Sequence, residues 1–329
     1  MRRKMGSSSN KKNNKKKQSN YHKKVALTVD QLLAAAEASM TALDVEQAAK
    51  LYFQARAQAT EVPVRLQILE KLGECHVSLG DQDKARQYFE EALSLLEQSS
   101  ATNDDTLAYH EARSNLYLYT GQLCMEHEAL QAYQKGIQSL EACQNMAMDE
   151  ETEKTFRQKI SGAYCTVAEL YLTDLCYDDN AEAECESYIE KALQIKDVDG
   201  EPLVDALQTM ASLRLSQKTR QQEAVPFILR AYDKMKIGCE ALATLVGLGD
   251  EEAAAAATMA DGEAAVELKE VDAANNLPEF EFRCQTAKLL LECAAILGES
   301  ASSNGSLPRD QCLSAAISVL GSLLAQNDE

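Results

Sequence analysis

Carboxylates are the side chains with the widest capacity for chemistry in this chain, because Asp and Glu number 52 against 33 Lys and Arg. Paired carboxylates can act as general acid and base, and clusters of them attract cations. The close pairs, such as Glu70 and Glu74, have the spacing of neighbours on one helix surface. No GxGxxG after a strand, GxxxxGK(S/T), HExxH or GxSxG motif accompanies them. The sequence therefore favours electrostatic binding over catalysis, and we expect no enzyme.

Metal and cofactor chemistry is not indicated either. The ten cysteines include no CxxC pair, and the four histidines are scattered. Cys165, Cys176 and Cys185 are expected to be small buried residues on the apolar faces of helices. We therefore expect no cofactor, no metal ion and no small-molecule ligand.

The elements that position the carboxylates are predicted from small and aromatic residues between positions 69 and 93. The residues with this spacing are Leu72, Gly73, Ala85, Phe89 and Ala92. Glycine and alanine allow two antiparallel helices to cross closely, Phe89 fills the gap between neighbouring hairpins, and Gly80 ends the first helix. Such spacing is typical of the tetratricopeptide hairpin of about 34 residues.

The spacing recurs along the chain. The equivalent residues are Ala48, Tyr52 and Ala55; Ala129, Tyr133 and Gly136; Cys185, Ile189 and Ala192; and Ala224, Ile228 and Ala231. Hairpins are predicted near 28–60, 65–98, 108–141 and 160–196, the fourth with extra residues between its helices. A fifth begins at Pro202, with the proline in its first turn. Stacked hairpins bury a continuous core, so we expect an all-α solenoid, a right-handed superhelix of antiparallel helix pairs.

Composition divides the chain into four predicted regions. These are a disordered basic tail at 1–25, five hairpins at 26–245, an acidic Ala/Gly-rich linker or insert at 246–278, and a helical hairpin at 279–329. No stretch reaches roughly 18 uninterrupted apolar residues, and the N-terminus has no apolar signal core. We expect a soluble, intracellular protein without membrane contact.

Charge is divided unevenly between the tail and the body. Residues 1–24 hold ten Lys or Arg and no acid, which leaves 23 basic groups against 52 acidic groups in the remainder. An acidic body should repel nucleic acid and attract a basic protein. The tail is a candidate nuclear-localisation signal, a weak RNA contact or a plain solvated segment. The lysines of this candidate signal are Lys11, Lys12, Lys15, Lys16 and Lys17.

Several acids fall at positions of the first helix in each hairpin that face the concave side of such arrays. They are Asp30, Glu37, Glu70, Glu74, Glu111, Asp174, Asp178 and Asp205. We expect them to form an acidic partner-binding groove; the alternative is that they coat a solvated face. Lys and Asn line this groove in repeat domains that clamp the acidic tail of a heat-shock chaperone, so Glu70 and Glu74 argue against that partner.

One segment is more specific than the repeat pattern. Residues 161–224, which contain AELYLTDLCY and DALQTMASLRLSQ, resemble the assembly chaperones dedicated to ribosomal protein four of the large subunit. These are acidic tetratricopeptide proteins of eukaryotes. The similarity extends to TVDQLLAAAEA, LYLYTGQL, ALQAYQKGIQSL and FRCQTAKLLLECA, and so covers most of the chain beyond residue 25 apart from the insert.

The resemblance implies a function. Members of that family shield a very basic, rRNA-binding ribosomal protein by gripping its long internal loop in the concave groove until delivery to the pre-ribosome. We expect a monomer of the cytoplasm and the nucleus or nucleolus, and within its best segment the resemblance supports Asp174 and Asp178 as groove residues. The rival hypotheses are an adaptor in a stable multi-subunit complex and, more remotely, a regulator of an enzyme complex. Reversibility distinguishes the chaperone, which should lose its client to rRNA or high salt.

The C-terminus departs from the family, which typically continues with a further aromatic-rich helical unit. A sixth hairpin is expected near 279–297 and 308–326. Without a polar capping helix, the apolar face formed by Ile317, Leu320 and Leu324 would be exposed. We expect that the chain either is truncated or is capped differently.

Overall fold

The computed structural model describes residues 27–99, 106–248, 274–298 and 308–327. Its regular elements in these ranges are thirteen α-helices and one short 3-10 helix, and the only β-type pairing there is an isolated bridge between Lys196 and Pro202. The prediction of an all-α fold is confirmed. The basic tail and most of the predicted 246–278 insert lie outside the described residues, so those two predictions stand as they were.

Five helical pairs follow one another along the chain. They are α1 (Val29–Thr41) with α2 (Val45–Arg56), α3 (Val62–Ser78) with α4 (Gln82–Ser99), α5 (Leu107–Leu123) with α6 (Glu126–Met146), α7 (Glu150–Leu172) with α8 (Ala181–Gln194), and α9 (Val204–Ser216) with α10 (Ala224–Asp233). The 3-10 helix η2 (Gln221–Glu223) precedes α10, and the remaining helices are α11 (Lys236–Leu245), α14 (Phe280–Leu297) and α15 (Pro308–Asn327). We call the first four pairs units one to four.

Local sequence explains where these helices start and stop. Thr28 and Gln31 form a reciprocal capping box that starts α1. Gly80, with φ at +75°, follows the end of α3 in the left-handed conformation that glycine adopts without strain. The expectation that Pro202 lies in the first turn of a helix is wrong. The N-cap of α9 is Leu203, so the proline precedes the helix and is buried at its bridge with Lys196.

The contact between Gly73 and Phe89 accounts for the close crossing in unit two. A β-carbon added at Gly73 would stand 2.7 Å from Phe89 Cδ1 and would overlap the other atoms on that edge of the ring. The Phe89 ring is fully buried and stacks on Tyr119 of α5, with centroids 5.0 Å apart. Phe89 therefore joins its own hairpin to the next, as its position in the pattern predicts.

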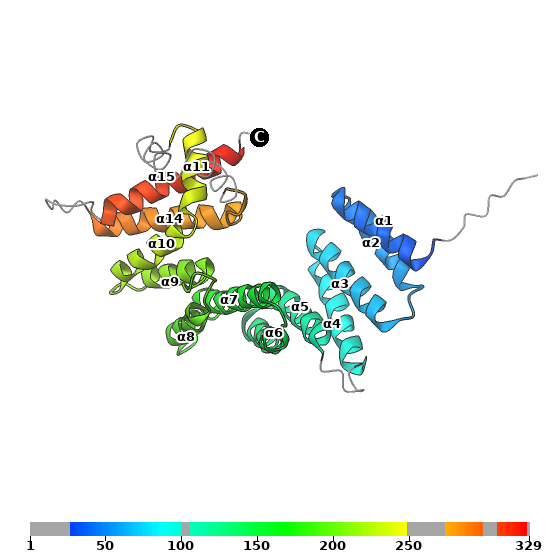
Figure 1. The fold of residues 1–329 in the computed structure, drawn as a ribbon. Helices are drawn as coiled ribbons and strands as arrows, with labels where there is room; N and C mark the ends of the chain where they lie inside the picture. Colours follow the sequence, from blue (N-terminus) through cyan, green and yellow to red (C-terminus); the bar gives the residue numbers. More distant parts are fainter. Residues whose placement is uncertain (1–26, 100–105, 249–273, 299–307, 328–329) are drawn as a thin grey trace, which may run out of the picture.

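The array curves. Figure 1 shows α3, α5 and α7 toward the inside of the curve and α4, α6 and α8 toward its outside. The C-terminal helices α14 and α15 pack on each other, and α15 packs on α11, where a β-carbon at Gly321 would stand 2.6 Å from that of Ala243. The outer stripe of α15 is exposed as expected: Ile317, Leu320 and Leu324 are 50%, 41% and 53% exposed.

Candidate functional site

Carboxylates of the first three units gather around Glu74. One Glu74 oxygen accepts a hydrogen bond from the Tyr119 hydroxyl of α5 at 3.2 Å, and the other lies 2.7 Å from the Lys71 ammonium. Glu70 stands one turn earlier on α3, and Glu37 of α1 lies near Tyr52 of α2, as Glu74 does. The contact between Tyr119 and Glu74 joins the first helices of units two and three, which Figure 1 shows toward the inner side of the curve.

The pKa values of neighbouring groups report how crowded this negative charge is. Burial raises the pKa of Glu70 above its usual range, the carboxylates of Glu74 and Glu111 add to that rise, and the Lys71 ammonium opposes it. Burial raises the pKa of Tyr52 to about 12, and Glu37 and Glu74 contribute to the shift. Glu70 of α3 therefore lies close enough to Glu74 and Glu111 to be repelled by them, and Glu37 and Glu74 both lie near Tyr52, which favours any cation that approaches.

Two lysines offset part of this charge. Lys71 pairs with Glu74, and Lys159 of α7 lies 3.5 Å from Glu111 of α5. Both ammonium groups are partly exposed, so these ion pairs exchange readily with solvent. A partner with arginines or lysines can replace them at little cost. We call Glu37, Glu70, Glu74 and Glu111 the inner acidic cluster.

A smaller acidic pair lies at the junction of α7 and α9. Asp205 of α9 accepts hydrogen bonds from the Ser161 hydroxyl at 3.2 Å and from the Ala206 backbone at 2.9 Å. Burial raises the pKa of Asp205, and partial burial together with Asp205 raises the pKa of Glu169. Asp205 is thus positioned by α7, while Glu169 was missed by the sequence analysis.

The placement of Asp174 and Asp178 on the first helix of unit four is wrong. Helix α7 ends at Leu172, and both residues lie in the 173–180 connection to α8, where Asp174 is exposed. The equivalent connection in unit two comprises only residues 79–81. The prediction aligned unit four with unit two by counting back from Cys185, the equivalent of Ala85. It did not allow for the extra residues of this connection, and so it assigned to the helix two residues that lie after its end. The corrected register places Glu169 where Glu74 stands in unit two.

Two further predicted positions differ from the inner acidic cluster. Asp30 is an exposed residue in the first turn of α1, where a carboxylate stabilises the helix dipole. Cys176 is exposed in the 173–180 connection, so the expectation that it lies on a buried helical face is wrong, whereas Cys165 and Cys185 are buried. The correction for Cys176 follows from the length of that connection.

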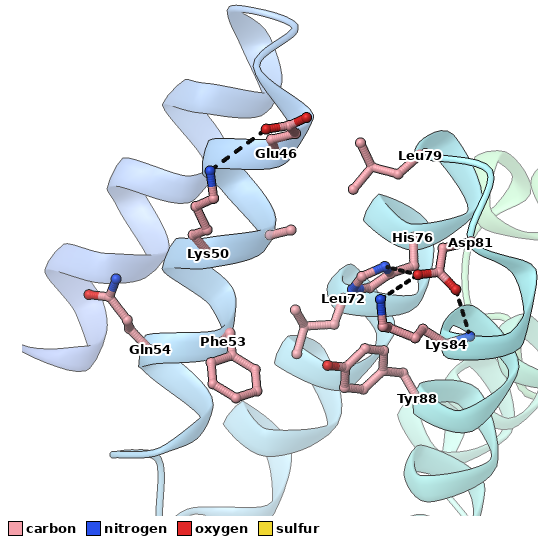
Figure 2. A pocket seen from close by; sticks show the side chains of 11 residues that line it. Glu46, Lys50, Phe53, Gln54, Leu72, His76, Leu79, Asp81, Lys84 and Tyr88 are labelled. Carbon is pink, nitrogen blue, oxygen red and sulfur yellow. Dashed lines mark hydrogen bonds and ion pairs between the residues drawn. The ribbon is translucent and has the colours of Figure 1, made fainter.

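A hollow of about 590 Å³ opens between units one and two (Figure 2). We call it the first hollow. Its apolar walls include Phe53 and Leu79, which are 56% and 41% exposed, and the Tyr88 ring, which stacks on His76 with centroids 5.4 Å apart. Its charged residues pair among themselves. Lys50 lies 3.7 Å from Glu46, and Lys84 lies 2.5 Å from Asp81. This surface is suited to apolar contact more than to a charged ligand.

The described ranges contain neither a metal site nor a membrane-spanning helix. No group of three or more His, Cys, Asp or Glu side chains there could hold a metal ion. Among the same residues, no helix is long and apolar enough to cross a membrane.

Comparisons with known proteins give a partial match. No protein-family model matches the chain. A protein of Schizosaccharomyces pombe (strain 972 / ATCC 24843) described as "Probable assembly chaperone of rpl4" is 41% identical over 150 residues. The matched region is 45% of this chain and 40% of that relative, so the match spans less than half of either protein.

Solved structures show the fold. The structure described as "Assembly Chaperone of RpL4 (Acl4) (Residues 1-338)" matches with a TM-score of 0.54 and 21% identity, over 92% of this chain and all of that chain. BtubC (BKLC) from P. vanneervenii is 19% identical over 62% of this chain and 78% of its own, with a TM-score of 0.45, too low to support an argument. The chain therefore shares the helical-repeat architecture of the first structure.

Proposed function

We propose that this chain is a non-enzymatic chaperone dedicated to a basic ribosomal protein of the large subunit, ribosomal protein four. The observation that carries the proposal is the inner acidic cluster, in which Glu70 and Glu74 lie among further carboxylates on successive first helices. The relative named as a probable assembly chaperone of rpl4 supports the identity of the client. The proposal does not rest on the other predicted groove residues, which are Asp30, Asp174, Asp178 and Asp205.

The physical role follows from charge. An unassembled rRNA-binding protein exposes a high density of lysine and arginine, which binds RNA indiscriminately and aggregates. The inner acidic cluster neutralises such a segment without burying it, because surface ion pairs are individually weak. Release then follows when rRNA competes for the same cations. We further propose that a monomer binds the client in the cytoplasm and delivers it in the nucleus or nucleolus.

The test is a binding experiment with purified ribosomal protein four and matched charge reversals. The E37K/E74K pair reverses two carboxylates of the inner acidic cluster. The E190K/E292K pair makes the same change of charge at two exposed residues of α8 and α14. We expect E37K/E74K to weaken binding by more than about tenfold, and E190K/E292K by less than about threefold. Equal losses in the two pairs would reduce the effect to net charge and overturn the proposed site.

Salt separates this proposal from a stable adaptor, which the apolar first hollow favours as a second candidate. Debye screening shortens from about 8 Å at physiological ionic strength to about 3 Å at 1 M. A client held by the inner acidic cluster should elute in high salt or on addition of rRNA. A partner held through Phe53 and Leu79 should stay bound under both conditions.

A further inference from the structure

A second hollow, of about 510 Å³, lies between units three and four. It is lined by α6, the end of α7, the 173–180 connection and α8, through Gln134, Tyr171, Asp178, Asp179, Asn180, Glu184 and Tyr188. Figure 1 shows α6 and α8 toward the outer side of the curve. We call it the second hollow.

The second hollow occupies the same place in the repeat as the first. The register of the small residues aligns unit one with unit three and unit two with unit four, and the longer 173–180 connection is taken into account. The pairs of equivalent residues are Phe53 and Gln134, His76 and Tyr171, Lys84 and Glu184, and Tyr88 and Tyr188. Each hollow has a ring from the end of a first helix stacked on a tyrosine, with interplanar angles of 24° for His76 on Tyr88 and 23° for Tyr171 on Tyr188.

The chemistry of the second hollow is anionic. Its charged lining consists of Asp178, Asp179 and Glu184, of which Asp178 lies 3.5 Å from the His127 imidazole, whereas the first hollow balances its acids with two lysines. Tyr171 is only 8% exposed, and its hydroxyl has no hydrogen-bond partner among the described residues although the side chain lines the hollow. Burial raises the pKa of Tyr171, and Glu184 and Asp178 add to that shift. The hydroxyl therefore stays neutral and retains free lone pairs near two carboxylates.

The expected ligand is an organic cation. The carboxylates do not converge as metal ligands would, because no metal-holding group occurs among the described residues. The Tyr188 ring already receives a cation on one side, where the Lys191 ammonium lies 4.4 Å from its centroid. A planar guanidinium can donate to two carboxylates and to a tyrosine oxygen at once, which a single ammonium satisfies less well.

We propose that the second hollow binds an arginine side chain of a basic partner on the outer face of the array. The inference rests on the proposed function only for the identity of that partner. A client that passes through the inner acidic cluster would gain a second anchor here, with Asp178, Asp179 and Glu184 as charge partners and Tyr171 as hydrogen-bond acceptor.

The test uses N-acetylarginine amide and the full-length chain with isotopically labelled tyrosine rings. The ring resonances of Tyr171 and Tyr188 are followed by NMR and assigned with Y171F and Y188F. We expect saturable shifts with the arginine probe and none with N-acetylcitrulline amide, its neutral isostere. E184K, which introduces the residue type of the first hollow, should weaken binding at least about fivefold, while E190K, the same charge change on α8 outside the hollow, should leave it intact.

Two results would overturn the inference: equal responses to arginine and citrulline, or equal losses in E184K and E190K. Y171F keeps the ring and the charge, so an unchanged affinity in that variant would remove Tyr171 from the site. Because the probe is a single amino acid, the outcome does not depend on the ribosomal client. Failure of E37K/E74K to weaken client binding would therefore count against the proposed function and not against the second hollow.

Discussion

The first and second hollows share a framework and differ in charge. In both, a ring at the end of a first helix stacks on the tyrosine of the following second helix, and the large residue directly after that tyrosine, Phe89 or Ile189, is buried in the core. On the rim, Lys84 is replaced by Glu184 and Phe53 by Gln134. Core packing thus determines the stacked rings that the two hollows share, while the side chains at the edge of a hollow can differ in polarity and charge.

The largest expected effect concerns that shared framework. G73A should lower the free energy of unfolding by about 1–3 kcal/mol, because the added β-carbon overlaps the buried Phe89 ring. G162A in α7 is the matched control, since its β-carbon would stand 3.7 Å from Asp205 and glycine inside a helix costs about 1 kcal/mol relative to alanine. Thermal unfolding should show a lower Tm for G73A and an equal or higher Tm for G162A. Equal Tm values would mean that the crossing in unit two is not close-packed.

Replacing three residues of the first hollow by their equivalents from the second hollow is expected to create arginine binding there. The triple variant F53Q/H76Y/K84E gives the first hollow the equivalent residues of the second. We expect the resonances of the Tyr88 ring to shift with N-acetylarginine amide. The affinity should be within about tenfold of that of the second hollow, because the two carboxylates of the 173–180 connection, Asp178 and Asp179, are not copied. A transplant with no response would show that the connection, and not the rim, determines the chemistry.

A smaller effect distinguishes the two stacked rings by pH. Burial lowers the pKa of His76 below 6.5, so the unfolded chain binds this proton more readily than the folded chain does. Stability from this group is complete above 6.5 and is lost as pH falls through 6.5 toward the lower folded pKa. H76Y should lack that loss, which we expect to be under about 1 kcal/mol. The Tm difference between wild type and H76Y at pH 7.5 and at pH 5.5 measures it, and an unchanged difference would contradict the burial of His76.

The smallest effect contrasts an inner with an outer carboxylate. The raised pKa of Glu70 means that its ionised form is disfavoured in the folded protein. The contribution of Glu70 to the free energy of unfolding therefore falls as pH rises through the pKa of the unfolded chain and then through that of the folded chain. E70Q should raise the Tm at pH 7 by about 1–2 °C, and the exposed control E190Q should not change it. A lower Tm in E70Q would show that the Glu70 carboxylate is stabilised by its neighbours rather than repelled.

The sequence is sufficient to predict the hairpins but not the helical register in every unit. Residues such as Gly73, Ala85 and Phe89 specify contacts within about twenty positions, and the structure reproduces them. The 173–180 connection contains helix-compatible residues and no proline or glycine, so nothing in it marks where α7 ends. Asp174 and Asp178 were misplaced for that reason.

The inner acidic cluster was largely predictable, and the hollows were not. Glu37, Glu70, Glu74 and Glu111 follow from the helical register within one hairpin. The second hollow combines Gln134 of one unit with Glu184 of the next, and this pairing depends on how units stack. The signal that could have revealed it is the recurrence of tyrosine directly before the large core residue, at Tyr88 and Tyr188, beside a change from Lys84 to Glu184.

The overlap that a β-carbon at position 73 would make with Phe89 has a consequence for the evolution of this sequence. Any side chain at position 73 needs a smaller residue at position 89, yet a smaller residue there leaves a void beside Tyr119 while position 73 is still glycine. Neither change is easily accepted first. We therefore expect the two positions to vary together among relatives that keep this pair of helices, with glycine wherever an aromatic ring is retained, and an alignment of such relatives can be examined for that covariation.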